Sequence, residues 1–378
     1  MQLIGGKKIR ECVYTNGGNT YIWSGIEGTP LIINRSKIIS NFHNEKKDLG
    51  IYLYEDKDDD GGSGSGGWDG GVGAAGGVTI PCDPLLIDLN GDGIQTTSLT
   101  SGTFFDYDGN GFAERMGWAS SDDGSELFSN YTPLNNGGTA TNGYAALKQE
   151  DTNKDGVVNN LDANWNNLNI WKDLNADGIS QSEELFTRED EGISTINLTA
   201  TAANITDAGG NTQTLSGTFT KTDGTIGEIA DYNLQSDPTY SIPAAWVTIP
   251  EDIAALPDLQ GYGNVYNLQQ AMAMDATGEL KALVEQFIAE ENPATRKAIM
   301  EQILFHWTDS EDITKNRGNM DGRQLATLEK FTGENFMGQF GPNPNAPAQV
   351  ILEQSYQNLL ETSYCHLMVQ THLQDLYG

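Results

Sequence analysis

The chain has 378 residues and is strongly acidic: 53 Asp and Glu residues stand against 21 Lys and Arg residues, a formal net charge of −32. This charge repels phosphate backbones and anionic membrane surfaces, so we expect no nucleic-acid partner. No apolar run is long enough to span a membrane, and the first residues lack the apolar core of a cleaved secretory signal. The excess of carboxylates has two possible interpretations: it forms a solubilising surface, or it provides binding sites for a hard cation.

Cysteine usage excludes two further classes. Cys12, Cys82 and Cys365 lie far apart, and no CxxC motif occurs. We therefore expect neither a zinc site nor a scaffold that depends on disulfides.

The N-terminal part offers no chemical motif. Residues 1–56 contain short β-type runs such as Thr20 to Trp23 and Ile51 to Tyr54, which predict a few strands. Residues 57–77 are rich in Gly and Ser and predict a flexible linker. The role of residues 1–56 stays open.

An Asp–Pro bond stands at the start of the next segment. The Asp83 carboxylate can reach its own carbonyl carbon and close a five-membered ring, which makes it an intramolecular nucleophile. Pro84 supplies a tertiary amide whose nitrogen leaves well once it is protonated. The dipeptide alone says little, because Asp237 and Pro238 form a second one and most such pairs are ordinary turns.

Two segments match the twelve-residue EF-hand calcium loop. In both, oxygen-bearing side chains stand at positions 1, 3, 5 and 12, glycine stands at position 6, and position 7 offers a backbone carbonyl. Calcium takes six to eight oxygens, which alternate residues of a tight loop can point inward. We predict calcium ligands, joined by a helix carrying Leu161, Trp165 and Leu168, at Asp151, Asn153, Asp155, Val157 and Asp162 in the first loop, and at Asp173, Asn175, Asp177, Ile179 and Glu184 in the second.

Two further segments match only in part. Asp88, Asn90 and Asp92 begin one loop, and Asp106, Asp108 and Asn110 begin another, but position 12 holds no acid in either. Each could bind calcium only with an acid from elsewhere, and the available ones are Glu114, Asp122, Asp123 and Glu126. Calcium sites and metal-free turns are equally compatible with these two segments.

Alternation and helical periodicity complete the fold prediction. From Ile193 to about Leu234 the pattern predicts a small antiparallel sheet, with a hairpin in LSGTFTKTDGTIG. From about residue 249 the pattern is helical, with helices expected over residues 279–291, from Pro293 onward, and over residues 349–376. The predicted class is α+β: an EF-hand-like calcium-binding module with a small antiparallel sheet at residues 78–240, followed by an α-helical domain at residues 241–378.

The order of the motifs DPLLIDLNGDGIQ, FFDYDGNGFAERMGW, DDGSELF and IWKDLNADGISQSEEL resembles the self-processing module of FrpC-type iron-regulated RTX proteins. The tail, with ILFHWT and QTHLQDLYG, resembles the haemolysin-type calcium-binding-related domain. The resemblance implies a calcium-triggered cut between Asp83 and Pro84, and an Asp anhydride that a lysine amine of a protein target can capture as an isopeptide. It also implies secretion, or display at the surface of a Gram-negative bacterium, by type I export. One Asp/Asn/Gly loop usual in that family is missing between Trp118 and Asp122.

Two alternatives remain beside single-turnover autoproteolysis. The module could be a purely structural calcium-folded piece of an adhesin or effector, without a chain break. A toxin or hydrolase with its active site in residues 1–56 or in the helical tail is a third reading, although no Ser/His/Asp or HExxH arrangement supports it.

Overall fold

The computed structural model describes residues 82–125, 128–338 and 341–374 with their side chains, and the backbone of residues 3–4, 7–16, 19–26 and 126. Near the N-terminus, β1 (Leu3–Ile4), β2 (Lys7–Asn16) and β3 (Asn19–Ile26) form an antiparallel sheet, which agrees with the strand expected at Thr20 to Trp23. The strand expected at Ile51 to Tyr54 and the predicted linker at residues 57–77 lie outside the described residues.

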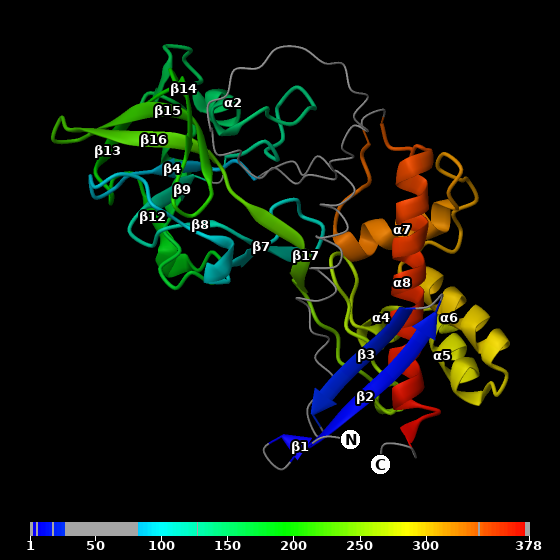
Figure 1. The fold of residues 1–378 in the computed structure, drawn as a ribbon. Helices are drawn as coiled ribbons and strands as arrows, with labels where there is room; N and C mark the ends of the chain where they lie inside the picture. The colour runs from blue at the N-terminus through cyan, green and yellow to red at the C-terminus, as the bar shows by residue number, and fades with distance from the viewer. Residues whose placement is uncertain are drawn as a thin grey trace, which may run out of the picture.

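Residues 82–243 build a sheet-rich unit around one nine-stranded antiparallel sheet (Figure 1). Its strand order is β10-β13-β15-β16-β4-β9-β11-β12, and β14 pairs with β15. The strands are β4 (Leu85–Ile87), β9 (Gly124–Glu126), β10 (Val157–Asn159), β11 (Asn169–Trp171), β12 (Leu185–Thr187), β13 (Ile193–Asn197), β14 (Thr201–Thr206), β15 (Thr212–Lys221) and β16 (Ile226–Asn233). The expected β15–β16 hairpin is confirmed.

The sheet is larger than the sequence predicted, because the loop-bearing segment contributes strands to it instead of packing on it. β4 lies between β16 and β9, and alternate residues of β4 enter two separate cores. Leu85 and Ile87 pack with Tyr144, while Leu86 packs with Trp118 on the opposite face. Both faces of the central strands are therefore covered.

Two small sheets and one short helix complete this unit. β17 (Ser236–Pro243), β7 (Phe112–Met116) and β6 (Phe104–Phe105) pair in that order, and β5 (Thr96–Thr97) pairs with β8 (Trp118–Ala119). The helix α2 (Gly143–Leu147) begins at Asn142, whose side chain accepts a hydrogen bond from the Ala145 backbone N–H.

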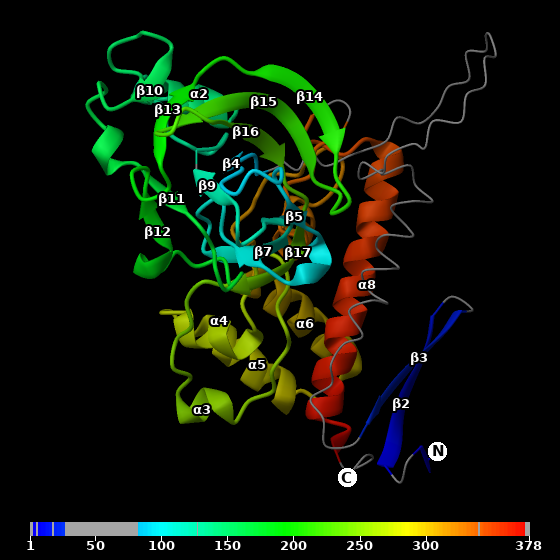
Figure 2. The same cartoon turned by 90° about the vertical axis from the view of Figure 1, so that its left-hand side faces the viewer.

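The C-terminal part is helical, as predicted. Its helices are α3 (Glu251–Ala254), α4 (Leu268–Met274), α5 (Glu279–Ala289), α6 (Pro293–Trp307), α7 (Gly322–Thr332) and the long α8 (Ala346–Gln370), labelled between them in Figure 1 and Figure 2. Buried side chains from this part form one core. Asn292 caps α6 ahead of Pro293, and Asn345 caps α8 ahead of Pro347. The last helix thus begins three residues earlier than predicted, at its cap, and ends before residue 376. Within the described residues no helix has the length and apolar character needed to cross a membrane.

The two units meet along β17 and at the start of β7. The Phe112 ring lies against the Tyr266 ring with centroids 4.8 Å apart and planes tilted by 58°, and the Thr239 hydroxyl donates to the carbonyl of Thr332 at 3.2 Å. These contacts join the sheet-rich unit to the segment ahead of α4 and to the end of α7.

Candidate metal centre and the Asp83–Pro84 bond

All four predicted loops share one backbone conformation. The glycine at position 6 has positive φ in each, at Gly93, Gly111, Gly156 and Gly178. Position 4 also has positive φ in each loop, at Gly91, Gly109, Lys154 and Ala176. Residues with a Cβ rarely adopt this region. The two partial loops are therefore folded like the two complete ones, although their sequences lack the acid at position 12.

The first carboxylate of each loop organises the turn. Asp151 accepts the backbone N–H of Asp155 at 3.1 Å and of Gly156 at 3.0 Å, and Asp173 accepts the corresponding pair at 3.2 and 2.9 Å. Asp106 repeats this pattern, and Asp88 accepts the N–H groups of positions 4 and 6. A carboxylate oxygen has more than one lone pair, so these bonds leave acceptor capacity for a cation.

The twelfth residue closes each complete loop from a buried position. Asp162 accepts the backbone N–H groups of Thr152 at 2.7 Å and of Asn159 at 3.0 Å. Glu184 accepts the Leu174 N–H at 3.0 Å and the indole N–H of Trp171 at 3.2 Å. The structure therefore brings positions 1 and 12 into each loop, while the predicted ligands at positions 3 and 5 are exposed, namely Asn153, Asp155, Asn175 and Asp177.

The prediction of a helix between the two complete loops is wrong. The segment forms a 3-10 turn at Trp165–Asn167 and then β11. Leu161 is 72% exposed, whereas Trp165 is buried, so the predicted apolar face does not exist. Asparagine side chains compete for backbone hydrogen bonds and disfavour helix interiors, and this segment contains several of them. Val157 begins β10 and Ile179 is exposed. The loops therefore lie between strands and short turns, not between two helices.

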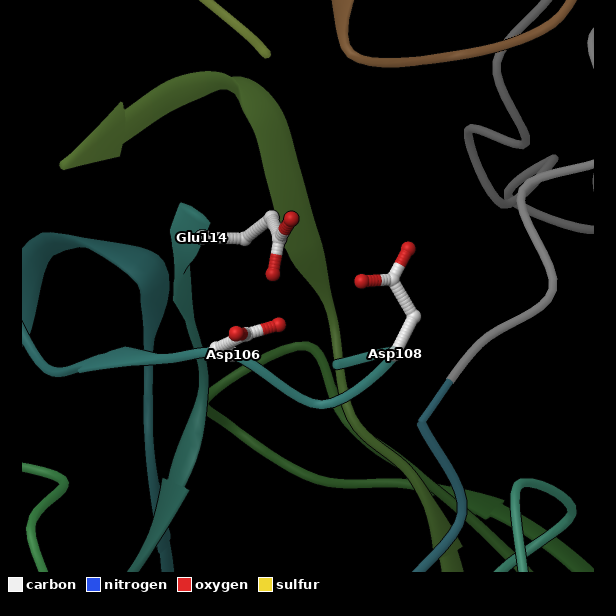
Figure 3. Close-up of side chains that lie close together, drawn as sticks. All are labelled: Asp106, Asp108 and Glu114. Carbon is white, nitrogen blue, oxygen red and sulfur yellow. The ribbon is translucent and has the colours of Figure 1, made fainter. Parts of the chain in front are cut away.

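The Asp106 loop obtains its extra acid from the next strand. Oxygens of Asp106, Asp108 and Glu114 all lie within 4.8 Å of one another, and Figure 3 shows the three carboxylates turned toward a common point. Glu114 stands at position 9 of this loop, on the inward face of β7 between Phe112 and Met116. Two oxygens bound to calcium at about 2.4 Å are at most about 4.8 Å apart, so the group has the right dimensions for one ion.

Glu114 is in an unfavourable state without a cation. Its side chain is only 2% exposed, and its Oε2 atom is buried without a hydrogen-bond partner. Loss of water contact, with the charges of Asp108 and Asp106, raises the pKa of Glu114 to about 8. The Asn110 amide donates to its other oxygen at 3.4 Å. A hard cation would satisfy the orphaned oxygen and offset the repulsion, so the residues present fit a calcium ion.

The Asp88 loop is approached by two acids that follow β8. The Asn90 amide donates to Asp122 at 3.0 Å, and the Gln95 backbone N–H donates to Asp123 at 2.7 Å. Asp123 is buried, and loss of water contact raises its pKa to about 7, with added contributions from the charges of Asp122, Asp88 and Asp92. The side chain of Glu126, the fourth acid considered, is not among those the structure describes.

The Asp83–Pro84 bond is buried at the entrance to β4. Asp83 is 5% exposed, and one of its carboxylate oxygens accepts the Asn130 backbone N–H at 2.5 Å. The Pro84 carbonyl accepts the Tyr232 N–H at 3.2 Å, and the Cys82 carbonyl accepts the Leu234 N–H at 2.9 Å. Burial, together with the charge of Asp231, raises the pKa of Asp83 to about 7 against the donation from Asn130.

Asp231 is the acidic neighbour of this bond. It lies on β16 opposite Leu85, which puts it on the same face of the sheet as Asp83 and diagonally across from it. It accepts the Gly143 N–H at 3.0 Å and the Thr214 hydroxyl at 3.0 Å, and burial raises its pKa to about 6. A Cβ atom at Gly143 would lie 2.7 Å from the Asp231 carboxylate and 2.6 Å from the Phe128 carbonyl, so only glycine fits.

The second Asp–Pro bond has different surroundings. The Asp237 carboxylate lies on β17 and forms an ion pair with Arg115 at 2.7 Å. This partner restrains the carboxylate. The two Asp–Pro bonds of the chain therefore differ in burial and in partner.

Part of the chain is similar in sequence to known proteins. Residues 85–235 match the model of a family described as SPM domain, a range that starts one residue after Pro84 and includes all four loops. A relative, the iron-regulated protein FrpA of Neisseria meningitidis serogroup C, is 34% identical over 262 residues, which is 65% of this chain and 23% of the relative. The chain thus spans less than a quarter of that protein's length. These similarities support the resemblance to iron-regulated Frp proteins.

A matched pair of glycine variants tests the loop geometry. Both Gly156 and Gly178 have positive φ, but only at Gly178 would a Cβ atom collide with the Phe104 carbonyl. Gly156→Ala should cost about 1–2 kcal/mol of unfolding free energy, which is the cost of the left-handed conformation alone. Gly178→Ala should cost more, because the second loop must separate from β6. Urea unfolding measures both, and equal losses would contradict the docking of this loop on β6.

The raised pKa values predict a pH dependence of stability in the calcium-free chain. Asp83, Glu114, Asp123 and Asp231 hold protons in the folded state at pH values where the unfolded chain, with Asp at 3.8 and Glu at 4.5, has released them. Their contribution is complete below the unfolded values and is lost as the pH rises through the folded ones. In excess chelator, Tm should fall from about pH 4.5 to about pH 8, the interval between the unfolded and the folded pKa values. Acids with lowered pKa, such as Asp162, titrate below this window. A Tm that rises or stays constant contradicts the burial of these groups.

Proposed function

We propose that residues 82–243 form a calcium-binding module that cleaves its own Asp83–Pro84 bond. The observation that carries the calcium part is the convergence of Glu114, with its orphaned buried oxygen, on Asp106 and Asp108. The four loops share one backbone conformation, which extends the same proposal to the loops that begin at Asp88, Asp151 and Asp173. Calcium bound there would link sites on several strands of one sheet and thereby favour folding.

The residues around Asp83 fit an intramolecular acyl transfer. The Asp83 carboxyl oxygen attacks the Asp83 carbonyl carbon and forms a C–O bond, and the C–N bond to Pro84 breaks. The proline nitrogen takes up one proton and leaves as a secondary amine, so the products are a cyclic anhydride at Asp83 and a new N-terminus at Pro84. The proton held by the Asp83–Asp231 pair near neutral pH is the available source.

The anhydride has two fates in this proposal. Water opens it to a C-terminal aspartate with two carboxylates. A lysine amine of a protein target opens it to an isopeptide amide and one carboxylate. Burial of the Asp83–Pro84 bond keeps bulk water away from the reacting carbonyl, which favours an attack from within the chain over hydrolysis.

The setting of this activity is part of the proposal. Extracellular calcium modules bind at about 10⁻⁴ to 10⁻³ M, so such sites fill after export rather than in the cytosol. The net charge of −32 and the similarity to an iron-regulated protein of Neisseria meningitidis support a secreted RTX-type protein. Type I export is proposed on the sequence resemblance alone.

Millimolar calcium added to chelator-purified protein tests the cut. We expect two fragments, Met1–Asp83 and Pro84–Gly378, identified by intact mass. Asp83→Ala should abolish cleavage while leaving calcium affinity unchanged, because Asp83 is not a proposed ligand. Asp237→Ala is the matched control at the other Asp–Pro bond and should leave the fragments unchanged. If the wild-type chain folds when calcium is added but stays intact, the cleavage proposal fails and the purely structural function remains.

The pH profile tests the mechanism. Since one carboxyl must be ionised and one proton must reach the proline nitrogen, the rate at saturating calcium should peak near pH 6 to 7 and fall above it. Asp231→Asn should slow cleavage by about 100-fold or more. Asp223→Asn, an exposed site at the tip of the same β15–β16 hairpin, is the control. A rate that climbs steadily to about pH 9 would exclude the proposed proton source.

A further inference from the structure

The Asp106 loop touches the segment that holds Asp83. Tyr107 stands between Asp106 and Asp108, and its ring meets the ring of Tyr131 edge-on, with centroids 5.1 Å apart and an interplanar angle of 71°. Loss of water contact raises the pKa of Tyr131 to about 12, with further contributions from the charges of Asp108 and Cys82. The Tyr131 side chain is therefore near both the Asp106 loop and the residue that precedes Asp83.

Tyr131 belongs to a tight turn whose backbone binds Asp83. The Thr132 N–H donates to the Ser129 carbonyl at 3.0 Å, and the Ser129 N–H donates to the Thr132 hydroxyl at 2.9 Å. Asn130 and Tyr131 are the two central residues of this turn, and the Asn130 N–H makes the 2.5 Å bond to the Asp83 carboxylate. A displacement of the Tyr131 ring therefore moves the donor that positions Asp83.

The Asp173 loop supports the same region from the other side. The Thr103 hydroxyl donates to the Ala176 carbonyl at 3.2 Å, and Gly178 lies against the Phe104 backbone. These residues lead directly into the Asp106 loop. The complete loop thus braces the strand before the Asp106 loop, and the Asp106 loop places the Tyr107 ring against Tyr131 of the turn.

We propose that a calcium ion held by Asp106, Asp108, Asn110 and Glu114 controls the reactivity of the Asp83–Pro84 bond through the contact between Tyr107 and Tyr131. The inference rests on the proposed function and adds the regulation of that site. Without the ion, Asp106 and Asp108 repel each other and one Glu114 oxygen stays buried without a partner, which destabilises the ordered loop. With it, Tyr107 is fixed, the turn is fixed, and Asn130 holds the Asp83 carboxylate in one orientation. Orientation of a reacting group on this scale is worth orders of magnitude in rate.

Removal of one charge tests the ion. Glu114→Gln keeps the size of the side chain and deletes the buried carboxylate, and Glu183→Gln, an exposed acid in the Asp173 loop, is the control. Glu114→Gln should bind one calcium ion fewer by titration calorimetry and should lose the tyrosine-sensitised luminescence of terbium bound beside Tyr107. It should cleave at least about tenfold more slowly at saturating calcium. The control should match the wild type in all three measurements.

Removal of the ring contact tests the path. Tyr107→Leu should keep the calcium stoichiometry but lose at least about tenfold in cleavage rate. Tyr107→Phe should lose less of the rate, because it keeps the edge-on ring and removes only the hydroxyl that hydrogen-bonds to Tyr131. Tyr107 is a positioning residue in this proposal. A rate for Tyr107→Leu equal to that of the wild type would overturn the path.

The two proposals fail differently. If the wild type cleaves and Glu114→Gln cleaves equally fast with unchanged stoichiometry, the regulatory site is excluded and the cleavage stands. If the wild type stays intact in calcium, the cleavage proposal fails and the NMR resonance of the Asn130 amide gives the readout. A calcium-dependent shift of that resonance in the wild type, absent in Glu114→Gln and Tyr107→Leu, supports the coupling, and an unchanged resonance excludes it.

Discussion

The structure depends on carboxylates that the fold removes from water. Asp83, Glu114, Asp123 and Asp231 are buried, and burial raises the pKa of each. An isolated buried charge is costly, so such groups must be protonated, hydrogen-bonded or bound to a cation. Hydrogen-bond donors meet this need at Asp231 and in part at Asp83, whereas Glu114 and Asp123 each keep a buried oxygen with no donor. An acid whose oxygens already have donors can stay as it is, whereas an acid with an orphaned oxygen has a position left for a metal ion.

Local patterns in the sequence predicted the features that local physics decides. Glycine at position 6 of each loop, the alternation before the β15–β16 hairpin, and proline in the first turn of α6 all act within a few residues. The structure has each of them where the sequence placed it. The positive φ at Lys154 and Ala176 was missed, because neither residue type signals a left-handed conformation.

Features that depend on pairing between distant segments could not be predicted from the sequence. The nine-stranded sheet arises because short segments of the loop region pair with β13, β16 and one another, and three-residue strands leave no periodicity to read. Glu114 was one of four available acids, and the register of β7 decides that it joins Asp106. A signal did exist: in FAERM the glutamate occupies an inward position between Phe112 and Met116, where an apolar residue is expected.

The position of β4 in the sheet decides what a break before it would do. Because β4 is paired on both sides, by β16 and by β9, every bond of its ladder stays with the piece that starts at Pro84. Among the described residues of the other piece, Cys82 pairs with Leu234 and Asp83 accepts the bond from Asn130, and the Cys82 side chain is buried in one of the cores. At this end of the cut, scission would therefore detach a chain end from the sheet and leave the β4 ladder intact.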